Sequence, residues 1–355
     1  MELEQYRKEI DQLDNQLLEI LNRRMEVVQK VGELKRVTKT SIYRPEREKS
    51  IIDRLSKLNK GPLKKGAIEA IYQEIFAISR NLELPELVSY LGPESSFTHQ
   101  AAESRFGAMS DYLALDTIKS VFESVSTGRA KFGVVPLENN QEGIVTETID
   151  LLSSFELNIV AEVPLSIHFA LGTIQERVHE IQKIYSRDIA FRQCRKFLNE
   201  TFIGRNVELI PVDSTSKAVK LARNEPGAAA ICSHIAAAKY NLPILFNNIE
   251  DAEDNFTRFL IVAKDMVNQP GGHDKTTILA KTSDKPGSLV SFLQDFQDAG
   301  INLTKIESRP AKKGKTFKYW FYIDFEGHFA DEKVAPVIEK HKKEIKLLGS
   351  YVRLC

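Results

Sequence analysis

The sequence predicts a multidomain protein made of an all-α region, an α/β region and a smaller α+β region. Three observations support this fold class. The chain has 355 residues, which at roughly 150 residues per domain corresponds to two or three domains. The spacing of apolar residues changes abruptly at Leu87, from a helical period to short strands alternating with helices. A segment with Pro and paired Gly, residues 265–274, then separates the last 80 or so residues from the rest.

The first region reads as three helices. Residues 4–38 predict one helix about 50 Å long at 1.5 Å per residue, and Pro45 suits the first turn of a second helix. Residues 61–66 form a loop before the third helix. The apolar stripe of the first helix recurs at steps of three and four residues: Ile10, Leu13, Leu17, Leu21, Val28, Val31 and Leu34. Because one helix is far longer than the others, this stripe needs a partner, and we expect an intertwined helical dimer.

The other two regions differ in the order of their elements. From residue 87 to about residue 264, strands such as KFGVVPLE alternate with helices such as SKAVKLARNE, which is typical of an α/β domain. Residues 275–355 follow the order β-α-β-β-α-β, the ferredoxin-like arrangement.

Composition narrows the functional classes. Lys plus Arg and Asp plus Glu both number 49, so no net charge attracts the chain to nucleic acid or to a membrane. No apolar run approaches the ~20 residues that span a bilayer, and the charged N-terminus is unlike a signal peptide. Cys194, Cys232 and Cys355 have neither disulfide nor zinc spacing. We expect a cytoplasmic protein without metal or organic cofactor, in which Cys194 and Cys232 are core residues.

Several cations lie close to the apolar stripe of the first helix. Arg24 and Lys35 are eleven residues apart, about 20° from alignment, whereas Arg7 lies about 100° off their shared face. They are either solvated helix charges or part of a pocket for a dianion, since paired cations match two carboxylates. The second and third helices add further polar residues: Arg44, Arg47, Glu48, Ser79 and Glu83.

The segments YRKEIDQLDNQLLEILNRRMEVVQKVGELK, YRPEREKSIIDRL and IYQEIFAISRNLE resemble the all-helical chorismate mutases over residues 4–84. The resemblance implies a chorismate mutase domain at residues 1–85. It implies that Arg24, Lys35 and Arg47 hold the substrate carboxylates and ether oxygen, and that Glu48 binds the ring hydroxyl. Arg44 belongs to the same substrate-binding set, Ser79 and Glu83 complete the wall, and Arg7 comes from the partner subunit.

These residue types suit the reaction. Chorismate rearranges to prephenate in one concerted step, so the enzyme holds the reactive conformer and stabilises negative charge on the ether oxygen with preorganised cations. Many relatives have Gln where this chain has Glu83, and a carboxylate donates a hydrogen bond only when protonated.

The segments VSYLGPESSFTHQAA, VVPLENNQEGIVTETIDLL, YSRDIAFRQCRKFL, DSTSKAVKLA and DNFTRFLIVA occur in that order. Singly, each is explained by helix caps or turns; together they resemble prephenate dehydratase over residues 87–264. The resemblance implies two α/β lobes like those of periplasmic binding proteins. Lobe one is residues 87–166 and 243–264, and lobe two is residues 167–242.

The same resemblance implies the residues of the dehydratase site. Thr257 lies closest to the chemistry, and Arg258 supports a substrate carboxylate. The cleft is lined by Glu138, Asn139, Ser186, Gln193, Ser214, Thr215 and Ser216. Prephenate loses carbon dioxide and hydroxide, so a hydrogen-bond donor at the departing hydroxyl is sufficient. The rim departs from the family pattern at Ser95, Asn140, Arg187, Asp188 and Ile189.

Two motifs of the last region resemble the regulatory ACT domain attached to prephenate dehydratases. Asp284, Pro286, Gly287, Ser288 and Leu289 open its first helix, and Glu307, Ser308, Arg309 and Pro310 end a strand. Taken alone, Pro286 and Gly287 are equally a simple helix start. The resemblance implies an ACT domain at residues 275–355 that binds L-phenylalanine. We interpret Lys312, Lys313, Lys315 and Lys318 as a solvated hairpin and not as a nucleic-acid site.

The sequence therefore predicts a bifunctional enzyme of phenylalanine biosynthesis with feedback inhibition. Its partners are chorismate, prephenate and L-phenylalanine, with no nucleic acid and no membrane, and it assembles as a homodimer or homotetramer. The alternative is a non-catalytic aromatic-metabolite sensor that uses the two-lobed cleft and the ACT domain.

Overall fold

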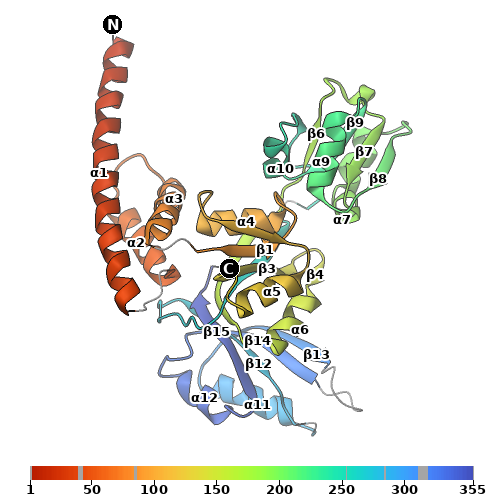
Figure 1. The fold of residues 1–355 in the computed structure, drawn as a ribbon. Coiled ribbons are helices and arrows are strands. Elements are labelled where there is room, and N and C mark those ends of the chain that lie inside the picture. The colour runs from red at the N-terminus through yellow and green to blue at the C-terminus, as the bar shows by residue number, and fades with distance from the viewer. Residues whose placement is uncertain are drawn as a thin grey trace. The chain divides into compact units, whose positions relative to one another are not determined.

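The computed structural model describes residues 2–38, 43–83, 86–252, 254–283, 285–310 and 319–354 (Figure 1). The predictions for Asp284, Cys355 and the basic hairpin with Lys312, Lys313, Lys315 and Lys318 lie outside these residues. The chain divides into two compact units. The first is Met1–Glu86 with Arg105–Asp111, and the second is Leu87–Ser104 with Tyr112–Cys355.

The first unit contains three long helices: α1 (Glu2–Thr38), α2 (Pro45–Leu58) and α3 (Lys65–Glu83). Pro45 occupies the first turn of α2 as predicted. The backbones of α1 and α3 approach closely at Gly32, where an added Cβ would lie 2.9 Å from the Glu83 Cα. Most of the apolar stripe of α1 is exposed in the single chain, namely Ile10, Leu13, Leu17, Val31 and Leu34, whereas Leu21 and Val28 are half-buried. Further apolar residues of α1 are also exposed: Leu3, Tyr6, Leu18, Ile20 and Val27.

Lobe one of the second unit is built on a six-stranded sheet. Its strand order is β2-β1-β3-β11-β5, with β4 on β3. The strands are β1 (Val88–Leu91), β2 (Tyr112–Leu115), β3 (Phe132–Asn139), β4 (Gly143–Ile144), β5 (Asn158–Ser166) and β11 (Phe256–Ala263). The helices are α4 (Phe97–Phe106), α5 (Ile118–Ser126) and α6 (Thr146–Ser154). Since β11 lies antiparallel between β3 and β5, the chain returns to this sheet after completing lobe two.

Lobe two has a five-stranded sheet in the order β10-β6-β9-β7-β8. The strands are β6 (Ala170–Thr173), β7 (Lys183–Ser186), β8 (Glu208–Pro211), β9 (Ala228–Cys232) and β10 (Ile244–Phe246). The helical segments are η1 (Val178–Glu180), α7 (Asp188–Gln193), α8 (Arg195–Thr201), α9 (Thr215–Asn224) and α10 (His234–Lys239). Because β10 pairs with β6, this lobe extends a few residues beyond the expected boundary at residue 242.

The last region has the predicted β-α-β-β-α-β order and forms a four-stranded antiparallel sheet, β13-β14-β12-β15. Its elements are β12 (Asp274–Ala280), α11 (Ser288–Asp298), β13 (Leu303–Pro310), β14 (Tyr319–Glu326), α12 (Ala335–Lys340) and β15 (Ile345–Val352). Both helices cover one face of the sheet (Figure 1), where Ile278 and Phe325 join their core. Alternate residues point to the other face, and there Leu279 and Tyr322 join the apolar core of lobe one.

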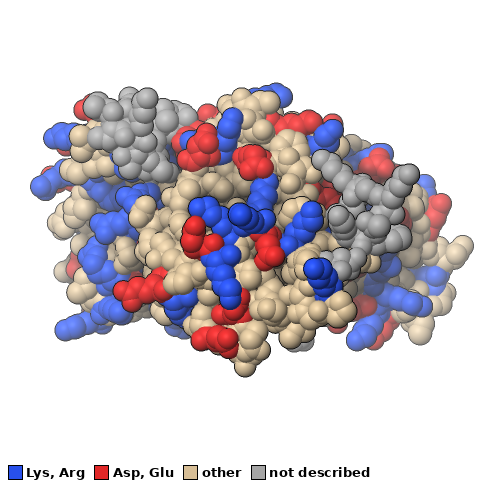
Figure 2. Space-filling model, turned by 90° about the horizontal axis from the view of Figure 1, so that it is seen from below, with Lys and Arg blue, Asp and Glu red and all other residues tan. Residues whose placement is uncertain are grey.

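Among the described residues, no helix is long and apolar enough to cross a membrane. Basic and acidic side chains intermingle on the face drawn in Figure 2, in keeping with the formal net charge of zero.

Candidate active sites

Two contacts join the cation face of α1 to α3. The Arg24 Nη1 group donates to Ser79 Oγ at 2.6 Å, and the Lys35 Nζ group donates to Glu83 Oε2 at 2.7 Å. Ser79 and Glu83 are one helical turn apart and therefore lie on the same face of α3. The structure thus brings together four of the residues expected in the mutase site.

The start of α2 supplies Glu48, which forms an ion pair with Arg80 of α3. Burial raises the pKa of Glu48 against the opposing effect of Arg80. Arg80 also donates to the Arg105 carbonyl at 2.5 Å and lies over the rings of Tyr43 and Phe106. Arg80 is a residue that the sequence interpretation missed, since nothing in its spacing marks it as a partner of Glu48.

The other expected mutase residues lie apart from these contacts. Arg44 pairs with Glu46 at 3.0 Å, and Arg47 is exposed. Arg7 pairs with Glu4 at 3.2 Å on the exposed N-terminal part of α1. Within one chain, the structure therefore does not bring Arg7 or Arg47 to Arg24 and Lys35.

A cavity of about 700 Å³ lies between the two lobes of the second unit, a volume suited to a small organic molecule. Lobe one contributes residues at the ends of β1, β3 and β11, and lobe two contributes the starts of α7 and α9. The predicted residues that line it are Asn139, Arg187, Ile189, Gln193, Ser214, Thr215 and Thr257.

Thr257 and Asn139 are paired across β11 and β3, and their side chains interact in the cavity. The Asn139 Nδ2 amide donates to Thr257 Oγ1 at 2.9 Å. The Asn139 Oδ1 atom accepts from the backbone amides of Gln141 and Glu142 at 2.9 and 3.0 Å, which fixes the orientation of the amide. Because Thr257 Oγ1 accepts this hydrogen bond, its own proton is directed to another acceptor.

Asn255 extends these contacts towards lobe two. Its Oδ1 atom accepts from Asn139 Nδ2 at 2.9 Å, and its Nδ2 group donates to Gln193 Oε1 at 3.0 Å. Asn255 belongs to the segment DNFTRFLIVA, which resembles the family, but no role was predicted for it from the sequence. Its position two residues before Thr257, on the same side of an extended chain, is the signal that was available.

Of the expected cleft serines, Ser186 and Ser214 make contacts within lobe two, and Ser216 joins lobe two to lobe one. Ser186 is buried and donates to the Ile231 carbonyl at 2.8 Å. Ser214 caps α9 by accepting from the Lys217 amide at 3.1 Å. Ser216 donates to the Glu94 carbonyl at 2.5 Å. Ser214 and Thr215 also line the cavity, whereas Ser186 and Ser216 do not.

Arg258 and Glu138 are not among the cavity residues. They form the strand pair adjacent to Thr257 and Asn139, so the alternation of side chains places them on the opposite face of the sheet. The Arg258 Nε atom lies 2.8 Å from Glu138 Oε1. The structure therefore gives Arg258 carboxylate partners of the protein itself, where the resemblance implied a substrate carboxylate.

The last region has a second cavity of about 450 Å³. Gly287 and Ser288 line it, and Gly287 has a φ of +82°, a conformation that glycine adopts without strain. Leu289 and the residues Glu307, Ser308, Arg309 and Pro310 do not line this cavity. Arg309 pairs instead with Asp150 of α6 at 3.1 Å.

Comparisons with known proteins match three families along the chain. The profile of chorismate mutase type II matches residues 6–84, that of prephenate dehydratase matches residues 88–267, and that of the ACT domain matches residues 276–342. The chain is 41% identical to the bifunctional chorismate mutase/prephenate dehydratase of Aquifex aeolicus, over 99% of this chain and 98% of that protein. It is 39% identical to the protein of the same description from Pseudomonas aeruginosa, over 99% and 97% of the two chains.

Among solved structures, the chain is similar to the prephenate dehydratase of Arthrobacter aurescens in complex with L-Phe. The TM-score is 0.69 at 31% identity, and the match covers 75% of this chain and 90% of that chain.

Proposed function

The chain belongs to the family of bifunctional chorismate mutase/prephenate dehydratases, and on that premise we propose how its residues divide the work. Residues 1–85 rearrange chorismate to prephenate. Residues 87–264 convert prephenate to phenylpyruvate, and residues 275–355 bind L-phenylalanine as the feedback effector. The observation that carries the assignment is the Asn139–Thr257 hydrogen bond inside the cavity between the lobes.

In the mutase site, Arg24 and Lys35 supply the positive charge that the dianion chorismate requires. Their present partners, Ser79 and Glu83, hold the two cations in place before substrate arrives. Because the rearrangement has no covalent intermediate, catalysis consists of fixing the reactive conformer and stabilising charge on the ether oxygen. Glu48 is held by Arg80 and is proposed to bind the ring hydroxyl.

In the dehydratase site, the Thr257 hydroxyl donates a hydrogen bond to the hydroxyl that leaves the prephenate ring. The ring carboxylate departs as carbon dioxide, and its bonding electrons complete the aromatic ring as the carbon–oxygen bond breaks. The leaving hydroxide takes one proton from the solvent and departs as water, so Thr257 keeps its own proton. Asn139 is proposed to orient the Thr257 hydroxyl, while Gln193 and Asn255 link it to lobe two.

Thr257→Ala in the full chain tests this assignment. Since the hydroxyl acts mainly in the transition state, we expect the dehydratase kcat to fall about 100-fold or more, with a small change in KM and with mutase activity retained. A large rise in KM with kcat intact would make Thr257 a binding residue only. Absence of phenylpyruvate formation by the unaltered chain would refute the dehydratase assignment itself.

We further propose that the chain assembles as a homodimer or homotetramer through the exposed apolar stripe of α1. The separation of Arg7 from Arg24 within one chain supports a site completed by the partner subunit's helix. Mixing inactive Arg7→Ala and Arg24→Ala chains should restore some mutase activity, because one site per mixed dimer is intact. Mixed dimers without activity would contradict this proposal.

The L-phenylalanine site is proposed to include Gly287, Ser288 and Leu289 together with the strand from Glu307 to Pro310. The cavity beside Gly287 supports the first group, and the exposed edge strand β13 is available to a second subunit. Loss of feedback inhibition in Gly287→Val, with catalysis retained, is the expected result. Unchanged inhibition would refute the assignment. The buried thiols Cys194 and Cys232 support a reducing compartment, so we propose a cytoplasmic location.

A further inference from the structure

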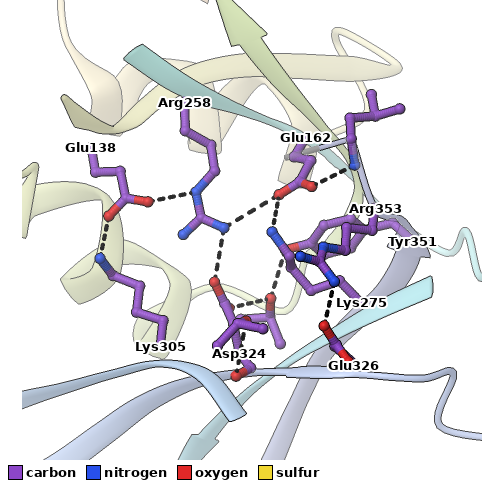
Figure 3. A network of polar contacts seen from close by, with 12 residues as sticks. Glu138, Glu162, Arg258, Lys275, Lys305, Asp324, Glu326, Tyr351 and Arg353 are labelled. Atoms are coloured by element: carbon purple, nitrogen blue, oxygen red, sulfur yellow. Dashed lines mark hydrogen bonds and ion pairs between the residues drawn. The ribbon is translucent and has the colours of Figure 1, made fainter. Parts of the chain in front are cut away.

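On the face of the lobe-one sheet opposite the dehydratase cavity, the Arg258 guanidinium is surrounded by carboxylates from three different strands (Figure 3). Its Nε atom lies 2.8 Å from Glu138 of β3, and its Nη1 atom lies 2.8 Å from Asp324 of β14 and 3.3 Å from Glu162 of β5. Arg258 is 3% exposed, Glu162 0% and Asp324 1%. Asp324 belongs to the ACT domain, so an ACT carboxylate is bound to the strand that carries Thr257.

The same cluster contains two lysines of the ACT domain. Lys275 lies 2.8 Å from Glu162, and Lys305 pairs with Glu138. With Arg258 and Asp324, the cluster holds three cations and three carboxylates, and its charges balance. The Thr277 hydroxyl donates to the second oxygen of Asp324 at 2.8 Å. Both oxygens of Asp324 are therefore fixed, and this carboxylate has a defined direction towards Arg258.

Strand register connects this cluster to the cavity on the other face of the sheet. The pairs Thr257–Asn139 and Arg258–Glu138 are consecutive rungs of the β11–β3 ladder, and the register shifts immediately after them. A bulge of this kind bends the strand and redirects neighbouring side chains. The end of β11 is thus held by the Asn139 amide on its cavity face and by the Arg258 ion pairs on its other face.

We propose that Arg258 and Asp324 are positioning residues for Thr257. The ACT sheet then contributes to dehydratase catalysis as well as binding the effector. This inference rests on the catalytic role proposed for Thr257. If stability were the only function, well-packed apolar residues would serve equally well at these buried positions. A directional guanidinium–carboxylate contact additionally fixes the geometry of the strand that carries it.

The test uses Asp324→Asn in the full chain, with Glu326→Gln as the matched control. Glu326 lies on the same strand, but its carboxylate is partly exposed and pairs with Arg353 instead of Arg258. We expect Asp324→Asn to lower the dehydratase kcat about 10-fold to 100-fold, the effect typical of a small misplacement. KM for prephenate should stay within about twofold, and Glu326→Gln should retain a kcat close to that of the unaltered chain. Mutase activity measured on the same samples reports the amount of intact chain.

Combining Asp324→Asn with Thr257→Ala distinguishes an effect exerted through Thr257 from a general loss of dehydratase activity. If Asp324 acts through Thr257, the double variant is no slower than Thr257→Ala alone, because effects of residues acting as a unit are not additive. A further slowing by the full factor seen for Asp324→Asn alone would overturn the proposal. An unchanged kcat in Asp324→Asn, or an equal loss in Glu326→Gln, would also overturn it.

A second variant covers the case in which Asp324→Asn does not fold. Arg258→Lys keeps the charge but lacks the fork that spans Glu138 and Asp324, and the proposal requires a similar loss of kcat. A Thr257→Ala variant that keeps full kcat would refute the role of Thr257 independently of Asp324.

Discussion

Replacing Lys275 with Met should destabilise the second unit strongly, because it leaves Glu162 buried without its nearest cation. Lys275 and Glu162 are both nearly inaccessible, and their charged atoms lie 2.8 Å apart. Removing one partner of a buried ion pair typically costs 3–5 kcal/mol. Glu162 keeps a hydrogen bond from the Leu354 amide at 2.9 Å and the more distant Arg258 at 3.3 Å. We therefore expect the lower end of that range, about 3 kcal/mol.

The pH dependence of this loss follows from the pKa of Glu162. Burial raises that pKa, but Lys275, the Leu354 amide and Arg258 together outweigh burial and hold the pKa below its ordinary value. A lowered pKa stabilises the folded chain above the unfolded value of about 4.3, and this contribution disappears as the pH falls through the folded value. Without Lys275, burial dominates and the pKa of Glu162 rises. The variant then gains stability on acidification, so its deficit is largest near neutral pH and shrinks towards pH 4 or so.

Urea denaturation of the full chain between about pH 4 and pH 7, followed by a probe in the second unit, measures this deficit. Lys340→Met is the matched control, since Lys340 pairs with Asp295 at 2.7 Å but is mostly exposed. An exposed pair contributes at most about 1 kcal/mol. The reasoning is refuted if both variants lose the same stability, or if the deficit of Lys275→Met does not change with pH.

Two further predictions concern the mutase. Glu83→Gln should raise the mutase kcat at neutral pH, because an amide donates a hydrogen bond to the ether oxygen and an ionised carboxylate does not; an unchanged kcat would contradict this. Arg80→Leu should raise KM for chorismate, because it releases Glu48 from its ion pair. Lys57→Leu on α2 is the control. Equal kinetics of the two variants would show that Arg80 has no role in the mutase site.

Much of the fold was predictable from the sequence, because the patterns that carry it are local. The helical period before Leu87, Pro45 at a helix start and the β-α-β-β-α-β order each depend on residues close together in the chain. The Asn139–Thr257 pair is different, since its members are far apart in sequence. It was expected only because two separate motifs resembled those of one family.

Arg258 shows how a sequence motif can suggest that a side chain points into a cavity when it points to the opposite face of the sheet. A motif places Thr257 and Arg258 together, but successive residues of a strand point to opposite faces. Alternation alone was enough to indicate that only one of the two faces the cavity. Arg80 was beyond such reasoning, because its partner carbonyl belongs to Arg105, in a segment that the chain reaches 25 residues later.

The ACT domain and lobe one also share an apolar core, which bears on how feedback can be studied. Leu279, Tyr322, Leu348 and Tyr351 are almost completely buried and pack with the core of lobe one. Burying each such side chain contributes roughly 1.5–3 kcal/mol, so the four together are comparable to the whole stability of a typical domain, about 5–15 kcal/mol. Removing residues 275–355 would expose the lobe-one side of this core and leave Arg258 without Asp324. Loss of dehydratase activity in such a truncated chain would therefore say nothing about regulation, whereas point substitutions at Gly287 and Asp324 separate effector binding from the positioning of Thr257.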